Sequence, residues 1–288
     1  MTRFTVVVLS LIVISLSSPT PEAGLWMFVG LSAARIDPET CAGMWLFDEG
    51  KGDTAKDSSG NKNDGTIKNG PKWVEGKFGK ALPFDGGATY VDCGNEASLA
   101  LTKELTVLAW VQFDGLDYKN STGKLLTIAA KGYPDALAPH AGWWFSYDNR
   151  NNGQGFPYTC FGNKNGGWAG GGNNFSGYNF VFDKDKWYHL SITVEQSIAA
   201  LYIDGTQLGA DKPLVNLVLS DTGRNLTIGS AGTSWYFDGI LDEVAVFNVA
   251  LSENEIGSVM TNGLEKATGM TAVSPKGKLT TTWGDIKQ

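Results

Sequence analysis

Hydrophobic and polar residues alternate along much of this 288-residue chain, in short runs separated by Gly- and Asn-rich turns. The clearest run is ELTVLAWVQFDG at 104–115, where every second position from the first Leu is apolar. This period of two is the pattern of a β-strand with one buried face. KWYHLSITVEQSIAALYIDGTQLG at 186–209 predicts two long antiparallel strands that meet near Gln196 and Ser197, with a second tight turn at Gly205.

Further strands are expected along most of the remaining chain. Their ranges are 43–50, 80–94 as two short strands, 124–132, 225–230 and 237–250. About a dozen strands with almost no helix predict an all-β antiparallel sandwich. One short helix is expected after the last strand, because Ser252 and Glu255 form a capping box and Gly263 supplies a stop.

Composition supports this fold class and excludes one class of partner. The chain is 42% hydrophobic and carries 10 Trp, 9 Tyr and 14 Phe, which is enough to bury a large core. Its net charge of -7 argues against nucleic acid, because binding phosphates needs a basic surface. Two histidines are too few for a histidine-rich transition-metal site.

The first 34 residues have the pattern of a secretory signal peptide. Arg3 precedes the apolar stretch FTVVVLSLIVISL at 4–16, and the small residues SAA end at Ala34. Cleavage there would leave a mature chain that begins near Arg35 and is secreted, extracellular or periplasmic. An uncleaved N-terminal anchor is the alternative. The mature chain contains no other stretch apolar enough to span a membrane.

The chain has three cysteines, Cys41, Cys93 and Cys160. Exported proteins often form disulfides, and three cysteines allow one bridge with one free thiol, or none. Cys41 and Cys93 both border predicted strands, which favours that pair. The absence of a CxxC spacing argues against a thiolate zinc site.

Several motifs, in the same order, resemble those of laminin G-like domains. The likeness rests on three stretches: the Trp-x-His strand with its Tyr-x-Asp-Gly turn, ELTVLAWVQF, and FDGILDEVAVFNVALSENEI. The N-terminal part of the family is matched by DSSGNKNDG and GKALPFDG. The resemblance implies a concanavalin A-like jelly roll of two antiparallel sheets over residues 42–263. Residues 264–288, with four Lys, lie outside the pattern as a C-terminal extension.

The stretch DSSGNKNDG at 57–65 has the composition of a turn, but it also offers the oxygen ligands that Ca²⁺ prefers. The resemblance implies that the Asp of the last-strand motif lies near a Ca²⁺ ion together with this loop. The candidate ligands are therefore Asp57 and Asp242, with Asn61 or Asn63 adding an oxygen. The alternative is that both aspartates cap backbone N–H groups.

Strict alternation in the last strand would place Asp242 on one face with Ile240 and Val244, and Glu243 on the other. No Glu-x-Asp-x-x-Glu run of paired carboxylates and no Gly-x-Ser-x-Gly elbow occurs, so catalysis is not expected. His189 lies in mid-strand without a nucleophile next to it, which favours a packed histidine.

Residues 132–185 are rich in Gly, Asn, Trp and Tyr, which suits recognition of a sugar or of a surface protein. The candidate ligand-binding residues are Trp168, Trp144, Tyr147, Asn149 and Tyr178. Alternation places Trp143 and Trp144 on opposite faces, so one of them packs in the core. The sequence predicts a secreted, non-catalytic module with a structural calcium site, whose partner is a carbohydrate or an extracellular protein. A purely structural or adhesive module, and a glycan-active enzyme, are the alternatives.

Overall fold

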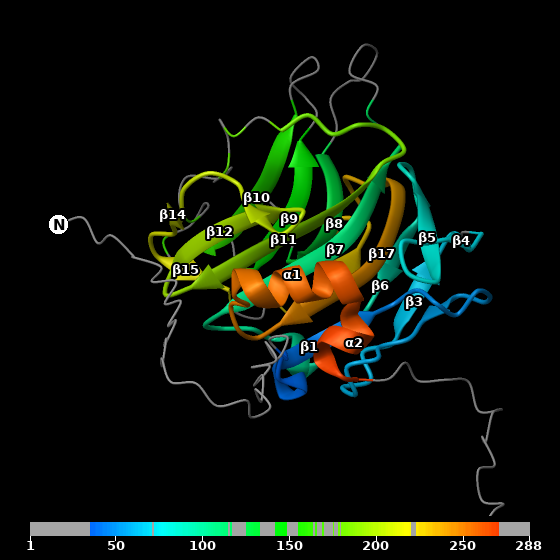
Figure 1. Ribbon diagram of the computed structural model, residues 1–288, viewed down its shortest axis with the longest axis horizontal. Coiled ribbons are helices and arrows are strands. Elements are labelled where there is room, and N and C mark those ends of the chain that lie inside the picture. Colours follow the sequence, from blue (N-terminus) through cyan, green and yellow to red (C-terminus); the bar gives the residue numbers. More distant parts are fainter. Residues whose placement is uncertain are drawn as a thin grey trace, which may run out of the picture. The chain divides into compact units, whose positions relative to one another are not determined.

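The computed structural model describes residues 35–70, 72–114, 116, 125–132, 142–148, 155–163, 165, 169, 175, 178, 180–219 and 223–270. All of them belong to the unit Ala33–Gln288. They form two antiparallel sheets whose inner faces share one core (Figure 1). The predicted all-β, concanavalin A-like sandwich is confirmed. The predicted signal peptide at 1–34 lies outside the described residues.

The first sheet has nine strands in the order β13-β12-β11-β7-β17-β5-β4, with β1 paired to β17 and β14 paired to β12. Their bounds are β1 (Cys41–Trp45), β4 (Val74–Glu75), β5 (Lys80–Asp85), β7 (Leu105–Phe113), β11 (Trp187–Glu195), β12 (Ile198–Ile203), β13 (Thr206–Gln207), β14 (Lys212–Pro213) and β17 (Asp238–Phe247). The β11–β12 turn is where the sequence predicted it, with positive φ at Gln196 and Ser197. Gly205 also has a positive φ, in the following tight turn.

The second sheet has eight strands in the order β15-β10-β9-β8-β16-β6-β3-β2. Their bounds are β2 (Thr54–Ala55), β3 (Gly65–Lys68), β6 (Tyr90–Asp92), β8 (Leu125–Lys131), β9 (Trp143–Asp148), β10 (Phe156–Asn163), β15 (Leu217–Val218) and β16 (Leu226–Ile228). The described residues also form two short 3₁₀ helices outside the sheets, η1 (Pro38–Thr40) and η2 (Ala97–Leu99).

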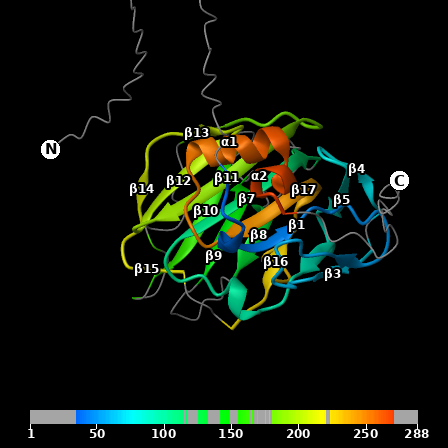
Figure 2. The same ribbon diagram turned by 60° about the horizontal axis from the view of Figure 1, so that its bottom comes forward.

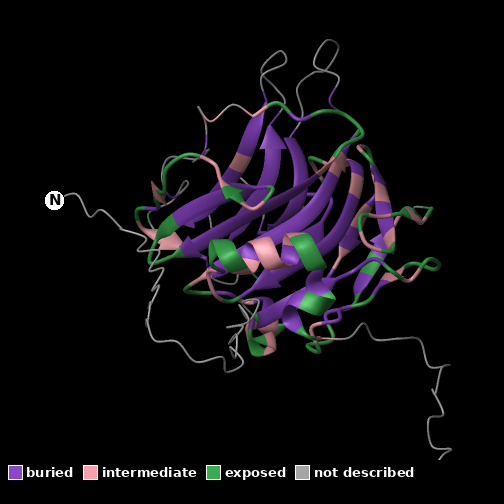
Figure 3. Cartoon of the chain, viewed as in Figure 1, coloured by how far each residue is buried: buried purple, intermediate pink, exposed green. Residues whose placement is uncertain are grey.

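The interior between the sheets is apolar because each long strand turns every second side chain inward. Val107 and Val111 of β7 share this core with Leu126 of β8 and Phe145 of β9. Each such side chain contributes about 1.5–3 kcal/mol when it is fully buried. Figure 3 shows the buried residues along both sheets. Trp143 belongs to this core, and Trp144 faces outward, as alternation predicts.

Two helices cover part of the outer face of the nine-stranded sheet (Figures 1 and 2). They are α1 (Glu253–Asn262) and α2 (Leu264–Thr268). The predicted capping box of Ser252 and Glu255 begins α1. The packed structure continues beyond Gly263, the predicted end of the domain, because Leu264 and Ala267 of α2 are buried in an apolar cluster with the sheet.

The last strand, β17, departs from strict alternation at Glu243. Its register against β7 shifts between Asp242 and Ala245, and Glu243 has a φ of 51°. This bulge inserts one residue, so Leu241 and Val244 both reach the interior core. The prediction that Asp242 and Val244 share a face is therefore wrong.

The predicted disulfide between Cys41 and Cys93 is not formed: both residues are described, and each is a free, buried thiol. Cys41 packs with the outer cluster beneath the helices, whereas Cys93 belongs to the interior core. Burial raises the pKa of both thiols above the ordinary range. Two residues that border strands can point to different faces, which is why the sequence argument failed.

Candidate functional site

The loop that the sequence offered as a calcium site is held by hydrogen bonds. Asp57 is only 3% exposed. One oxygen of its carboxylate accepts the backbone N–H of Met44 at 3.0 Å and of Ser59 at 2.9 Å, and the other accepts that of Asn63 at 2.8 Å. Three N–H donors to one carboxylate fix the loop against β1, as a charged cap does.

The two asparagines of this loop present amide hydrogens to the backbone. The Nδ2 group of Asn61 donates to the carbonyl oxygens of Cys41 at 2.9 Å and Ala42 at 3.2 Å. That of Asn63 donates to Ala42 at 2.8 Å, and its Oδ1 accepts the hydroxyl of Ser98 at 3.1 Å. The side-chain oxygen of Asn63 and those of Asp57 are thus already engaged.

Asp242 is fully buried and holds a different segment. Its Oδ2 accepts the backbone N–H groups of Lys77 at 2.8 Å and Phe78 at 2.9 Å, while its Oδ1 has no partner. Burial, reinforced by the charges of Glu243 and Asp48, raises the pKa of Asp242 to about 8, against the effect of the two backbone bonds.

Glu243 holds the C-terminal end of the fold. Its Oε2 accepts the backbone N–H of Leu264, the first residue of α2. Burial, together with Asp48 and Glu265, raises the pKa of Glu243 to about 7. The bulge thus lets two neighbouring carboxyl groups anchor two segments on the outer face of the sheet.

The four predicted calcium ligands make separate sets of hydrogen bonds in this arrangement. Asp57, Asn61 and Asn63 are together, but Asp242 contacts the Lys77–Phe78 turn instead. Within the described residues, no group of three or more His, Cys, Asp or Glu side chains could hold a metal ion. The side chains fit the alternative of backbone capping, and calcium stays a prediction.

The predicted ligand-binding aromatics separate into different environments. Tyr147 is buried in the core against Phe113, with ring centroids 5.2 Å apart, so it cannot contact a ligand. The hydroxyl of Tyr178 accepts the backbone N–H of Ala210 at 3.1 Å, and Lys212 lies 4.2 Å from its ring centroid, which fixes a surface loop. Trp168 and Asn149 lie outside the described residues.

Trp144 leads to a residue that the sequence analysis missed. It lies on the outer face of the eight-stranded sheet, in a small cluster with Cys160, and Tyr158 packs against that cluster. Trp235 covers it edge to face, with centroids 4.8 Å apart, and is 37% exposed. Trp235 has a φ of 51° after a turn that the Ala231–Ser234 bridge closes. The sequence signal that could have indicated Trp235 is the run of turn-forming residues Gly-Thr-Ser directly before it.

Polar residues continue this face across neighbouring strands. The register pairs Asp92 of β6 with Thr227 of β16, Thr227 with Ala130 of β8, and Ala130 with Trp144 of β9. A cleft of about 270 Å³ lies at the polar end. Its lining includes Tyr90, Asp92, Arg224, Asn225, Thr227 and Thr233. We call Trp144, Tyr158, Trp235 and these six residues the Trp235 face.

Hydrogen bonds and ring contacts order the polar part of the Trp235 face. The Asp92 carboxylate accepts the side-chain N–H of Asn225 at 2.8 Å and the backbone N–H of Gly94 at 3.1 Å. Tyr90 packs against Tyr236 with centroids 6.2 Å apart. The face therefore presents an exposed indole next to hydroxyl, amide and carboxylate groups.

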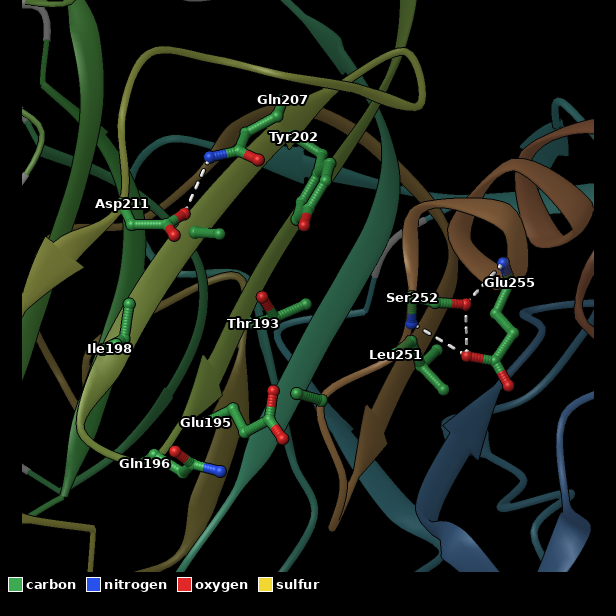
Figure 4. Close-up of a pocket in the computed structure, with 12 residues that line it drawn as sticks. Thr193, Glu195, Gln196, Ile198, Tyr202, Gln207, Asp211, Leu251, Ser252 and Glu255 are labelled. Atoms are coloured by element: carbon green, nitrogen blue, oxygen red, sulfur yellow. Dashed lines mark hydrogen bonds between the residues drawn. The ribbon is translucent and has the colours of Figure 1, made fainter. Parts of the chain in front are cut away.

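A second cleft, of about 430 Å³, lies on the nine-stranded sheet beside the first turn of α1 (Figure 4). Ile198, Tyr202 and Leu251 are its main apolar lining, and Glu195, Asp211 and Glu255 are its carboxylates. The other residues that line it are Thr193, Gln196, Ala200, Gln207, Ala250 and Ser252. We call this cleft the α1 groove.

His189 is packed, as the sequence predicted. Its ring is fully buried without a hydrogen-bond partner, and burial lowers its pKa to about 3. The ring contacts Trp110 at a centroid distance of 5.3 Å. The backbone N–H of His189 donates to the Asp204 carboxylate at 2.8 Å, which ties the Trp-x-His strand to its Tyr-x-Asp-Gly turn.

Comparison with known families matches residues 85–257 to the Laminin_G_3 family of the concanavalin A-like lectin/glucanases superfamily. No curated protein matches the chain. Within the described residues, no helix is long and apolar enough to cross a membrane.

Solved structures show the same fold. Domain 4 of AbnA, a GH43 extracellular arabinanase of Geobacillus stearothermophilus solved with arabinotriose, is 19% identical with a TM-score of 0.56, covering 77% of this chain and 98% of that one. The binding domain of Paraclostridial Mosquitocidal Protein 1 is 16% identical with a TM-score of 0.55, and the match covers 77% of this chain and 52% of that one. Trypanosoma rangeli sialidase in complex with the inhibitor DANA is 17% identical with a TM-score of 0.53. The match covers 76% of this chain and 32% of the sialidase, so this chain spans about a third of that enzyme. At these identities the likeness concerns the fold alone.

Proposed function

Because the chain belongs to the concanavalin A-like lectin/glucanases superfamily, we propose that it is a secreted recognition domain that binds a carbohydrate through the Trp235 face, without catalysis. The observation that carries this proposal is the exposed ring of Trp235, which is packed on Trp144 beside a polar cleft. The ring is held at the surface by a buried neighbour, so it is available to a ligand without rearrangement.

The chemistry of the Trp235 face suits a sugar. A pyranose or furanose ring has an apolar C–H face, which an indole can cover, and a rim of hydroxyls that needs donors and acceptors. Asp92 and Asn225 supply carboxylate and amide groups, and Thr227 and Thr233 supply hydroxyls. A few convergent polar groups beside an aromatic surface are typical of ligand sites. The arabinotriose complex of AbnA domain 4 supports the proposal as an analogy of fold.

The proposal that the domain is not an enzyme rests on the carboxylates of this face. Asp92 is the one carboxylate among the described residues that line the cleft, and it already accepts two hydrogen bonds. Glycoside hydrolysis by the usual route needs two carboxyl groups on either side of the bond. Incubation of the protein with the glycan that it binds best should release no reducing ends.

Glycan binding is tested by screening the exported protein against arabinan-, cellulose-, chitin- and sialoglycan-derived oligosaccharides, followed by calorimetry on the best ligand. Trp235→Ala should weaken binding about tenfold or more, equivalent to about 1.4 kcal/mol. Tyr178→Ala, which removes another partly exposed aromatic, is the matched control and should leave the affinity unchanged. Absence of binding to any glycan, or equal affinities of wild type and Trp235→Ala, would overturn the proposal.

Secretion is tested separately by expressing the chain with residues 1–34 and sequencing the exported product. The expected N-terminus is Arg35. A product that stays in the membrane with residues 1–34 attached would support the anchor instead.

A further inference from the structure

Among the described residues, α1 and α2 cover only part of the outer face of the nine-stranded sheet (Figure 1). The apolar cluster beneath α1 and α2 includes Leu108 of β7 and Phe247 of β17, and it continues to Ala200 and Tyr202 of β12. Ala200 and Tyr202 line the α1 groove, and Figure 4 shows Tyr202 on its strand beside the first turn of α1. The groove is therefore an extension of a face that the C-terminal segment already covers.

The α1 groove combines a few apolar side chains with negative charge. Ile198 is 43% exposed there. Glu195, Asp211 and Glu255 lie around it, and the described residues that line the groove include no lysine or arginine. A segment that carries both apolar and basic side chains complements this surface.

Residues 271–288 have that composition. They contain Lys276, Lys278 and Lys287 against a single acidic residue, Asp285, together with apolar residues such as Trp283. They follow directly on α2, whose buried residues belong to the same apolar cluster. The segment reaches roughly 60 Å when extended. The groove lies at the first turn of α1 and the segment starts after α2, so the distance to be covered is on the order of the combined length of the two helices, about 23 Å.

We propose that residues 271–288 dock in the α1 groove of their own chain, placing lysines beside Glu195 and Asp211 and apolar side chains over Ile198 and Tyr202. The segment would complete the cover that α1 and α2 begin. The Trp235 face lies on the other sheet, so this docking does not depend on carbohydrate binding.

The test uses the exported protein with Thr281→Cys carrying a nitroxide spin label. The three native cysteines are buried, so the added thiol is labelled selectively. At low salt, the label should broaden the amide NMR signals of Ile198 and Gln207. The amide signal of Asn69, which follows β3 of the eight-stranded sheet, should be unchanged. Broadening should disappear in about 1 M NaCl, where the screening length falls to about 3 Å.

Charge variants decide whether the groove is responsible. The double variant Glu195→Gln, Asp211→Asn should reduce the docked fraction about threefold to tenfold, because exposed ion pairs are individually weak. The matched control Glu39→Gln, Glu96→Gln changes two exposed carboxylates elsewhere and should have no effect. An unlabelled ¹⁵N chain mixed with a spin-labelled ¹⁴N chain should show no broadening. Broadening of Ile198 and Gln207 in that mixture, or no selective broadening of these signals in the labelled ¹⁵N chain, would overturn the proposal.

Discussion

The outer faces of both sheets carry an apolar cluster, but the two faces differ in what packs over that cluster. On the nine-stranded sheet, α1 and α2 cover an apolar cluster, and Asp242 and Glu243 hold the neighbouring segments in place. On the eight-stranded sheet, Trp144 packs edge to face against Trp235, which itself remains partly exposed. Residues on the first face should therefore govern stability, and residues on the second should govern binding.

The largest expected effect is on the covered face. Phe247→Ala removes a fully buried ring beneath the helices and should lower the free energy of unfolding by about 3–5 kcal/mol. Urea denaturation followed by circular dichroism measures it. Thr66→Ala, on the exposed eight-stranded face, is the comparison and should change stability by less than about 0.5 kcal/mol. Equal losses of stability in the two variants would contradict the expected difference between the two outer faces.

The next effect concerns the N-terminal loop, which hydrogen bonds alone can explain. Asp57→Ala leaves three backbone N–H groups without their acceptor and should cost about 2–3 kcal/mol. Thermal unfolding of the wild type in calcium and in chelator tests the predicted calcium site separately. A midpoint that rises with calcium in the wild type, but not in Asp57→Ala or Asp242→Ala, would support the predicted calcium site, and midpoints that calcium leaves unchanged would contradict it.

The anchors of the covered face should make stability depend on pH. The pKa values of Asp242 and Glu243 are raised to about 8 and about 7, so the folded state holds protons that the unfolded state releases. Their contribution is fully present below about pH 4, and it is lost as pH rises through about 7 to 8. Each group changes the free energy of unfolding by at most about 1.4 kcal/mol per pH unit.

Denaturation series between pH 5 and pH 9 measure this dependence, and Asp242→Asn separates the two anchors. The variant keeps a neutral side-chain oxygen that can accept the N–H groups of Lys77 and Phe78. It should therefore reduce the slope with pH while retaining the fold. Stability that increases over this range, or an unchanged slope in Asp242→Asn, would show that burial does not dominate at Asp242.

The smallest stability effect is expected at the binding face. Trp235→Ala removes a partly exposed ring and should change the free energy of unfolding by about 1 kcal/mol or less. A loss comparable to that of Phe247→Ala would assign Trp235 a structural role and weaken the case for binding.

The sequence predicted the parts of the fold that periodicity determines. The alternation in β7 and the β11–β12 turn were both located correctly, because apolar residues recur at every second position and the turn lies between two such runs. The capping box of α1 was also visible, since Ser252 and Glu255 have the required spacing. These signals are local and need no knowledge of distant contacts.

The sequence could not predict features that depend on long-range packing. The bulge at Glu243 adds one residue to a strand, and two adjacent carboxylates give no sign of where alternation breaks. Cys41 and Cys93 looked alike in sequence, but they lie in different apolar clusters.

The aromatic residues show both what alternation can predict and what it cannot. Trp144 and Tyr147 differ by an odd number of positions, so alternation alone places them on opposite faces and excludes a shared site. The exposure of Trp235 depends on its contact with Trp144, about ninety residues earlier in the chain, and no local pattern encodes that contact.

The most direct test of the comparison is to map the contacts of the best glycan ligand by NMR on the exported protein. We predict that the indole N–H of Trp235 and the amides of Asn225 and Thr227 shift on titration, while those of Ile198 and Gln207 in the α1 groove do not. Shifts confined to the α1 groove would contradict the assignment of binding to the eight-stranded sheet.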